Sequence, residues 1–219
     1  MKGVKFGNYH SYINFSLILK KGGLTLETPK AKTEYVEIPG ADGKLDLTDY
    51  FGDVKYSNRK LSASFETMLR HQEFFDLIET IANAIHGKRL NIILDEETNF
   101  YLVGRVNVNQ YKSIEQIGAI VIDADCEPYK LEINETIVSH TLNSVEKEVY
   151  LTNLRKRVSP SIEVVANEGE NVYLTFEGTT YSLSNGSWTI PEMILKEGQN
   201  YIKLSGNGTI TFKYRRGKL

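Results

Sequence analysis

The 219-residue chain contains a single cysteine, Cys126, together with one tryptophan and five prolines. A lone cysteine cannot form an internal disulfide, so the fold must depend on packing rather than on covalent cross-links. It also cannot supply a zinc site that needs several thiolates. This cysteine usage is typical of a protein that folds in a reducing cytosol, and we expect the chain to be made there.

Positive charge is not in excess. Lysine and arginine together number 26 against 28 aspartates and glutamates, which gives a net charge of −2 and a pI near 6.1. Proteins that bind nucleic acids neutralise phosphates with clustered basic side chains, so specific nucleic-acid binding is disfavoured. No apolar run approaches the ~18 residues of a membrane span, and the N-terminal residues lack the apolar segment of a signal peptide. The sequence therefore predicts neither membrane insertion nor an export signal.

The residues that are abundant favour strands. Thirteen tyrosines and nine phenylalanines accompany many β-branched residues, all of which fit pleated sheets. The 41% hydrophobic and 25% charged fractions are ordinary for a globular protein. We expect a mainly β protein, and the length of 219 residues alone allows one large domain or two small ones.

Hydrophobic periodicity places the elements of the first half. Alternation of apolar and polar residues predicts strands over 13–19 and 60–66, and the turn-rich Pro39–Gly43 allows strand pairing on either side. The spacing of Phe74, Ile78, Ile81 and Ile85 predicts an amphipathic helix from about His71 to His86, ended by Gly87.

Strands continue from the helix to a proline. Residues 90–94 and 101–109 are typical of a hairpin, and 119–126 form a further strand. Glu127-Pro128 ends that strand, because proline has no amide donor for a ladder. We therefore predict a first domain over residues 1–130.

The second domain is predicted over residues 131–219, with linking strands up to about residue 160. Six short strand-like segments follow, at 162–165, 172–176, 180–183, 187–190, 201–204 and 209–214. Glycine-containing turns separate them, and Asn185-Gly186 is a strong hairpin signal. This rhythm is typical of a small β sandwich.

Three carboxylates, Asp123, Asp125 and Glu127, share one face of the 119–126 strand and its end. Such a cluster could bind a hard cation or supply general acid and base. A solvated strand face, with Arg105 pairing across the sheet, is the favoured interpretation. An enzyme that hydrolyses cell-wall material with Asp123 and Asp125 is therefore a distant hypothesis.

The remaining candidates for chemistry are sparse. His10, His71, His86 and His140 are scattered without metal-ligand spacing, and we interpret His86 as a helix-end residue. No nucleophile elbow, phosphate loop or dinucleotide fingerprint occurs. The sequence thus predicts no enzyme, no metal and no cofactor.

Two features could contact partners. Trp188 and Tyr181 could form an aromatic platform for a sugar, although a lone tryptophan in a small sandwich is more often part of the core. The basic runs Arg155–Arg157 and Arg215-Arg216 could contact an acidic partner, and a solvated strand end and tail are the favoured interpretation.

Several short motifs follow one another along the chain in an order that is similar to that of one protein family. The stretch 35–48 is followed by Gly52 and by residues 56–59, then by 86–88, 101–106, 126–130, 190–192, 197–200 and 212–217. The first-domain motif positions are Pro39, Gly40, Asp42, Gly43, Asp46, Asn58, Arg59, Gly87, Lys88, Gly104, Pro128 and Tyr129. Together these motifs resemble the distal tail proteins, or phage tail family proteins, of long-tailed phages and prophages of Gram-positive bacteria.

That resemblance implies a β-sandwich-like first domain with one packed helix and a projecting hairpin, and a second domain similar to galectin or carbohydrate-binding sandwiches. It implies a structural protein of the virion tail tip, assembled in the bacterial host cytoplasm as a hexameric ring. The ring would join the tail tube to tail-associated or receptor-binding proteins at the baseplate.

Ring formation requires two different patches on each copy. The Asp95–Asn99 tip and the polar face of strand 101–109 are physical candidates. A lumen through which DNA passes gains nothing from a basic lining, so we expect it to be neutral or acidic. The alternative function is a carbohydrate-binding adhesion module that recognises host cell-wall sugars.

Overall fold

The computed structural model describes residues 2–50, 52–114 and 117–219. Strands make up 56% of it and helices 9%, so the expected mainly β class is confirmed. The chain divides into two compact units, Met1–Lys130 (unit 1) and Leu131–Leu219 (unit 2). Each unit has its own hydrophobic core.

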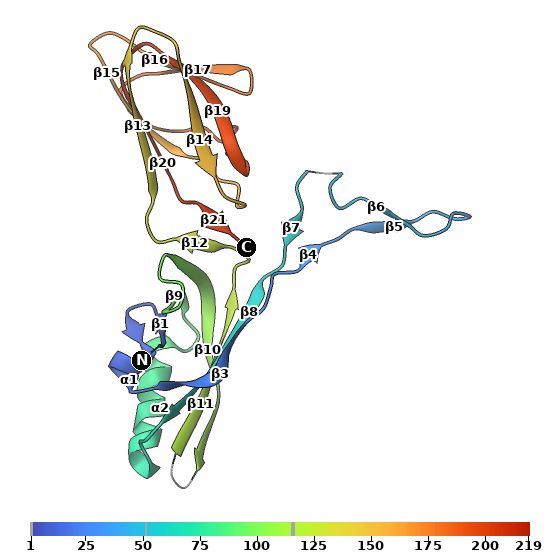
Figure 1. The fold of residues 1–219 in the computed structure, drawn as a ribbon, viewed down its shortest axis with the longest axis vertical. Helices are drawn as coiled ribbons and strands as arrows, with labels where there is room; N and C mark the ends of the chain where they lie inside the picture. Colours follow the sequence, from blue (N-terminus) through green and yellow to red (C-terminus); the bar gives the residue numbers. More distant parts are fainter. Residues whose placement is uncertain (1, 51, 115–116) are drawn as a thin grey trace. The chain divides into compact units, whose positions relative to one another are not determined.

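Unit 1 is built on one antiparallel sheet with the strand order β2-β1-β9-β10-β11-β8-β3 (Figure 1). The strands of unit 1 are β1 (Val4–Phe6), β2 (Tyr9–His10), β3 (Ile18–Leu26), β4 (Ala31–Lys32), β5 (Tyr35–Glu37), β6 (Lys44–Asp46), β7 (Lys55–Tyr56), β8 (Arg59–Thr67), β9 (Arg89–Leu94), β10 (Phe100–Ile114) and β11 (Ile117–Cys126). Helix α2 (His71–Ile85) packs on the sheet. The predicted amphipathic helix is confirmed, because the four apolar residues that predicted it are all buried: Phe74, Ile78, Ile81 and Ile85.

The prediction of a strand over 13–19 is wrong in its first half, where the chain forms the short helix α1 (Ser11–Phe15). The His10 imidazole accepts hydrogen bonds from the amides of Tyr12 and Ile13, which starts the helix. Ser16 ends it with a positive φ of 54°. Ile13, expected to face the core, is therefore 77% exposed.

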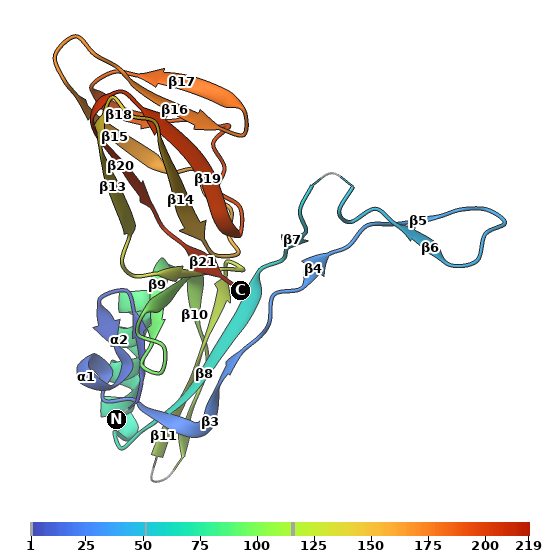
Figure 2. The same ribbon diagram turned by 45° about the horizontal axis from the view of Figure 1, so that its top comes forward.

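The strands on either side of Pro39–Gly43 do pair, and they extend a single long hairpin. The β3–β8 ladder ends at Leu26 and Leu61, and further pairs follow between β4 and β7 and between β5 and β6. We call residues 27–50 and 52–58 the arm. Figures 1 and 2 show the arm running outward from the sheet of unit 1.

Unit 2 is a β sandwich. One sheet has the order β13-β20-β15-β18 and the other β14-β19-β16-β17, and both contribute to one buried core. The strands are β12 (Lys130–Glu132), which begins at the last residue of unit 1, β13 (Thr136–Asn143), β14 (Lys147–Asn153), β15 (Ser161–Ala166), β16 (Val172–Phe176), β17 (Thr179–Leu183), β18 (Gly186–Thr189), β19 (Gly198–Ser205), β20 (Asn207–Tyr214) and β21 (Gly217–Lys218). All six strand segments predicted after residue 160 are present.

Candidate functional site

The arm is the part of unit 1 with the least buried surface. Every residue from 32 to 46 is exposed. Its large apolar side chains are far from covered: Tyr35 is 52% exposed, Ile38 48% and Leu45 47%. An isolated two-stranded hairpin is marginally stable in water, because it has no second layer against which to bury an apolar face. Exposed apolar side chains on such a hairpin indicate a surface that another molecule covers.

The motif residues at the tip of the arm shape its turn. Pro39–Gly43 connects β5 to β6, and both Gly40 and Gly43 have positive φ angles of 81° and 80°. A residue with a Cβ atom would be strained at either position. A hydrogen bond from the Thr48 side chain, and then one from the Thr48 backbone amide, lower the pKa of the Asp46 carboxyl group. These residues form the hairpin tip and give it no catalytic group.

The motif residues at the root of the arm hold it to the sheet. The Asn58 amide donates to Asp125 at 3.2 Å, and the ring of Tyr129 meets that of Tyr56 edge-on at 6.1 Å. Arg59 is only 4% exposed and lies opposite Cys126 in the ladder. Burial lowers the pKa of Arg59 and raises that of Cys126 to about 12. The buried thiol is therefore not poised as a nucleophile.

Other motif residues have local structural roles. Gly87 has a φ of 72° and follows α2, and the Lys88 ammonium donates to the carbonyl oxygens of Asn83 and Ala84 at the end of that helix. A Cβ atom on Gly104 would lie 2.7 Å from the Cys126 sulfur, so the two strands approach too closely for a side chain there. Pro128 follows β11.

The carboxylates of β11 do not form one solvated row, and this expectation is wrong for Asp123. Asp123 is only 8% exposed, accepts a hydrogen bond from Asn109 at 2.7 Å and lies 3.4 Å from the Lys60 ammonium. Asp125 accepts from Asn58, and Glu127 pairs with Arg89. Each acid thus has a different partner.

Arg105 does not pair with these acids as expected. It lies opposite Asp125 in the ladder, yet its guanidinium donates to the Gly87 carbonyl oxygen at 2.6 Å. His86, at the end of α2, accepts a hydrogen bond from the Val108 amide, beside the irregularity in β10. Both side chains therefore join the end of the helix to the strand beside it.

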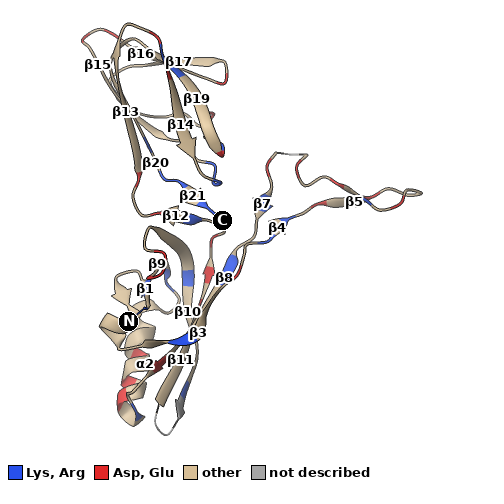
Figure 3. Ribbon diagram, viewed as in Figure 1, with Lys and Arg blue, Asp and Glu red and all other residues tan. Residues whose placement is uncertain are grey.

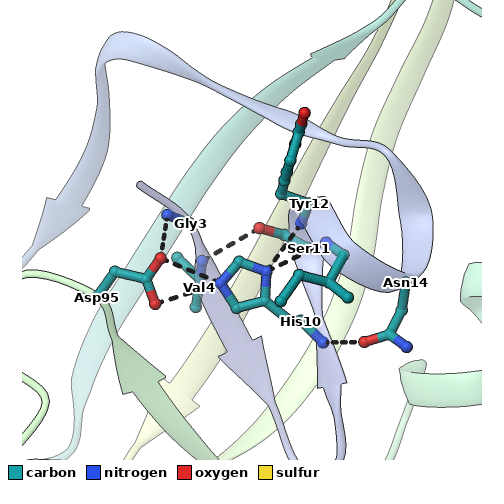
Figure 4. Close-up of polar contacts among 8 residues, drawn as sticks. Gly3, Val4, His10, Ser11, Tyr12, Asn14 and Asp95 are labelled. Carbon is teal, nitrogen blue, oxygen red and sulfur yellow. Dashed lines mark hydrogen bonds and ion pairs between the residues drawn. The ribbon is translucent and has the colours of Figure 1, made fainter. Parts of the chain in front are cut away.

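His10 and Asp95 form a polar pair that the sequence did not predict (Figure 4). His10 Nε2 lies 3.0 Å from Asp95 Oδ2, and Asp95 also accepts from the Gly3 amide at 2.7 Å. Because His10 Nδ1 accepts from two backbone amides, its proton resides on Nε2 and is donated to Asp95. We call this pair the N-terminal anchor.

The N-terminal anchor is not a catalytic triad. The neighbouring Ser11 is fully buried, and its hydroxyl accepts a hydrogen bond from the Val4 amide. That hydroxyl is therefore engaged in the fold rather than aimed at a substrate. The Asp95–Asn99 tip is also tied down, since Glu96 pairs with Lys2 and Glu97 with Lys130.

In unit 2, Trp188 and Tyr181 lie in different sheets. Tyr181, on β17, packs against the core. Trp188, on β18, lies opposite the fully buried Ile162, is 37% exposed, and donates its indole N–H to the Ser184 carbonyl oxygen. A second aromatic pair faces outward instead. Tyr150 and Tyr201 lie directly opposite on β14 and β19, with ring centroids 5.5 Å apart.

The basic runs are largely engaged within unit 2. Arg155 pairs with Glu197 at 2.7 Å, and Arg216 pairs with Glu132 at 2.8 Å. The Arg215 guanidinium donates to the Glu132 and Ile133 carbonyl oxygens. Among the residues that the structure describes, no three histidine, cysteine or acidic side chains come together as a metal site needs. None of the helices among the described residues is long and apolar enough to span a membrane.

These features define a class: two β units without a cross-link, with an extended arm and with polar clusters that hold the fold together. The same fold occurs in the crystal structure of the Dit protein (gp 19.1) of phage SPP1, described as a paradigm of the hub adsorption apparatus in phages that infect Gram-positive bacteria. The TM-score is 0.71 at 13% identity, over 98% of this chain and 99% of that one. The resemblance to phage distal tail proteins is thus confirmed for the fold.

Comparisons based on sequence give no further support. No protein-family model matches the chain, and no curated protein matches it significantly.

Proposed function

We propose that this protein is a structural hub of a phage tail tip. Six copies form a closed ring that joins the tail tube to the tail-tip, baseplate and receptor-binding proteins, and the role requires no catalysis. The observation that carries this proposal is the arm: a fold shared with a phage hub protein presents exposed apolar side chains on a hairpin that has no covering layer. A patch on the arm that differs from the patch it contacts gives the head-to-tail arrangement that closes rings.

Mass measurement and negative-stain microscopy of the purified chain test the ring. We expect particles of six copies with an open bore, in equilibrium with single copies at low concentration. A chain that stays monomeric throughout the accessible concentration range contradicts the proposal. Particles with a closed centre contradict the hub role in particular.

The bore would let DNA pass. The chain has a net charge of −2, and this supports a neutral or acidic lining that does not hold phosphates. We expect assembled rings to show no retention of duplex DNA in a mobility-shift experiment at physiological salt. Tight, salt-sensitive retention would contradict a lumen of this character.

Sugar binding by unit 2 is the alternative function. Tyr150 and Tyr201 support it better than Trp188 and Tyr181, because both project from the outward face of one sheet and are 56% and 39% exposed. Aromatic rings beside polar groups suit sugar rings, which have apolar C–H faces and hydroxyl rims. The Tyr201 hydroxyl donates to Glu148, and this hydrogen bond raises the pKa of Tyr201.

Binding of the full chain to purified cell-wall glycans distinguishes the two aromatic pairs. Loss of binding in Tyr201→Ala places the sugar on the outward pair, and loss in Trp188→Ala places it at the sheet edge. Tyr173→Ala is the matched control, since Tyr173 is 44% exposed on the next strand. Absence of glycan binding by the unaltered chain removes the alternative.

A further inference from the structure

The tip of the arm has a strong charge of one sign. Residues 33–50 contain five acidic side chains and one lysine, although the chain as a whole is close to neutral. The lysine, Lys44, is already paired with Glu37 at 2.9 Å. Together with the exposed Tyr35, Ile38 and Leu45, these acids make the tip both acidic and apolar. A complementary surface must be basic and apolar.

Unit 1 carries such a surface at the base of the same long hairpin, away from the tip of the arm. A hollow of about 400 Å³ lies along β3, the last strand of the sheet. Its lining is Lys2, Ile18, Leu19, Lys20, Lys21, Gly22, Leu24 and Glu96. We call it the β3 groove. Figure 3 shows the basic residues of β3 in blue.

The β3 groove combines an apolar floor with surplus positive charge. Leu19 and Leu24 are only partly buried and pack on the core, so their remaining surface faces the groove. Three lysines oppose one glutamate in the lining. Lys2 pairs with Glu96 at 2.8 Å and Lys20 with Glu66 at 3.0 Å. Lys21 has no ion-pair partner among the residues that the structure describes, so it supplies the unpaired positive charge of the groove. The groove also follows a sheet edge, where backbone groups lack a neighbouring strand.

We propose that the tip of the arm, residues 33–50, docks into the β3 groove of a second copy of this chain. The inference rests on the proposed ring, for which it names the two patches. The signs of charge match, both surfaces carry uncovered apolar side chains, and the two patches differ. That difference makes the contact heterologous, as ring closure requires.

The arm cannot reach the β3 groove of its own copy. Strand β3 lines the groove and then leads into the arm, and the antiparallel pairs continue outward through β4 and β7 to β5 and β6. The 13 residues from Glu27 to Pro39 span up to about 40 Å when extended. A 130-residue unit has a radius of gyration of about 14 Å, so the arm is long enough to lie across a neighbouring copy.

Charge reversal of each patch tests the docking in the full-length chain. Glu34→Lys with Asp42→Lys reverses charge on the tip, and Lys20→Glu with Lys21→Glu reverses it in the groove. We expect each pair to raise the concentration for half-assembly at least tenfold, because attraction becomes repulsion at the contact. The chain with all four substitutions should assemble within about threefold of the original, since complementarity returns with the signs exchanged.

Glu168→Lys with Glu170→Lys is the matched control for the tip pair, because it changes the net charge by the same amount and sign in an exposed segment of unit 2. We expect it to leave assembly unchanged. Rings that persist in both charge-reversed pairs overturn the docking and leave the proposed ring intact. A four-substitution chain that assembles no better than either pair also overturns the docking. A native chain without rings overturns the ring and the docking together.

Discussion

Replacing His10 with alanine removes both contacts of the N-terminal anchor. The two amides of Tyr12 and Ile13, each 3.2 Å from His10 Nδ1, lose the acceptor that caps α1. Loss of such a cap costs about 1 kcal/mol. The hydrogen bond to Asp95 contributes about another 1 kcal/mol, the usual net value for one hydrogen bond, because both side chains remain partly exposed to water. Asp95 keeps the Gly3 amide and some solvent contact, so we expect a total loss near 2 kcal/mol.

Hydrogen exchange followed by mass spectrometry measures this loss where it occurs. A change of 2 kcal/mol corresponds to about 30-fold faster exchange of the amides in residues 3–15, if they exchange by local opening. Fluorescence of the single tryptophan is unsuitable, since Trp188 lies in unit 2. Exchange that accelerates to within a factor of two of this value supports the reasoning, and exchange at the rate of the unaltered chain refutes it.

His10→Asn separates the two contributions. Asparagine caps helices well and would restore an acceptor for the α1 amides, while its shorter side chain would not reach Asp95. We expect about half the destabilisation of His10→Ala. If both variants exchange alike, the link to Asp95 carries the whole effect and the capping argument is wrong.

Four further outcomes follow from the packing and the pKa shifts. Gly104→Ala should lower the free energy of unfolding of unit 1 by about 2 kcal/mol in a denaturant titration, because the new Cβ atom would meet Cys126 and the backbone of Asp125. Ile81→Ala should cost about 3 kcal/mol in the same assay, since Ile81 is fully buried between α2 and the sheet. Cys126 should resist thiol reagents at pH 8 until unit 1 unfolds, because burial raises its pKa to about 12; rapid labelling of the native chain would contradict this. Burial, and then Lys147, lower the pKa of His140, so the folded chain takes up its proton at lower pH than the unfolded chain. The contribution of His140 to stability is therefore complete above pH 6.5 and is lost as the pH falls below it, and His140→Gln should remove this part of the pH dependence measured by thermal unfolding.

Hydrophobic periodicity correctly predicted the elements that bury one face in the core of unit 1. Helix α2 and strand β8 appear where expected, because Phe74 and Ile81, like Leu61 and Phe65, face the core of unit 1. The failure at residues 13–15 has a local cause. Alternation suits a strand, but the capping imidazole of His10 and the left-handed Ser16 favour a turn of helix over the same residues.

The candidate site was harder to predict because its residues are distant in sequence. Arg105 lies opposite Asp125, yet a guanidinium can reach past its ladder partner to the Gly87 carbonyl oxygen. The pairing of His10 with Asp95 joins residues 85 positions apart and has no sequence signal. The acidic run of the arm was visible in the sequence, but the β3 groove depends on how β3 lies at the end of the sheet.

Although the net charge of the whole chain is small, unit 1 carries patches of opposite charge at separate places. Averaged over 219 residues, the value of −2 argues only against nucleic-acid binding. The structure divides it into an acidic arm tip and a groove with surplus lysine. If docking brings these patches together, their charges neutralise each other inside the contact and do not add to the lining of the bore. Assembly should then weaken as salt rises, because the paired charges at the rim of such a contact are screened.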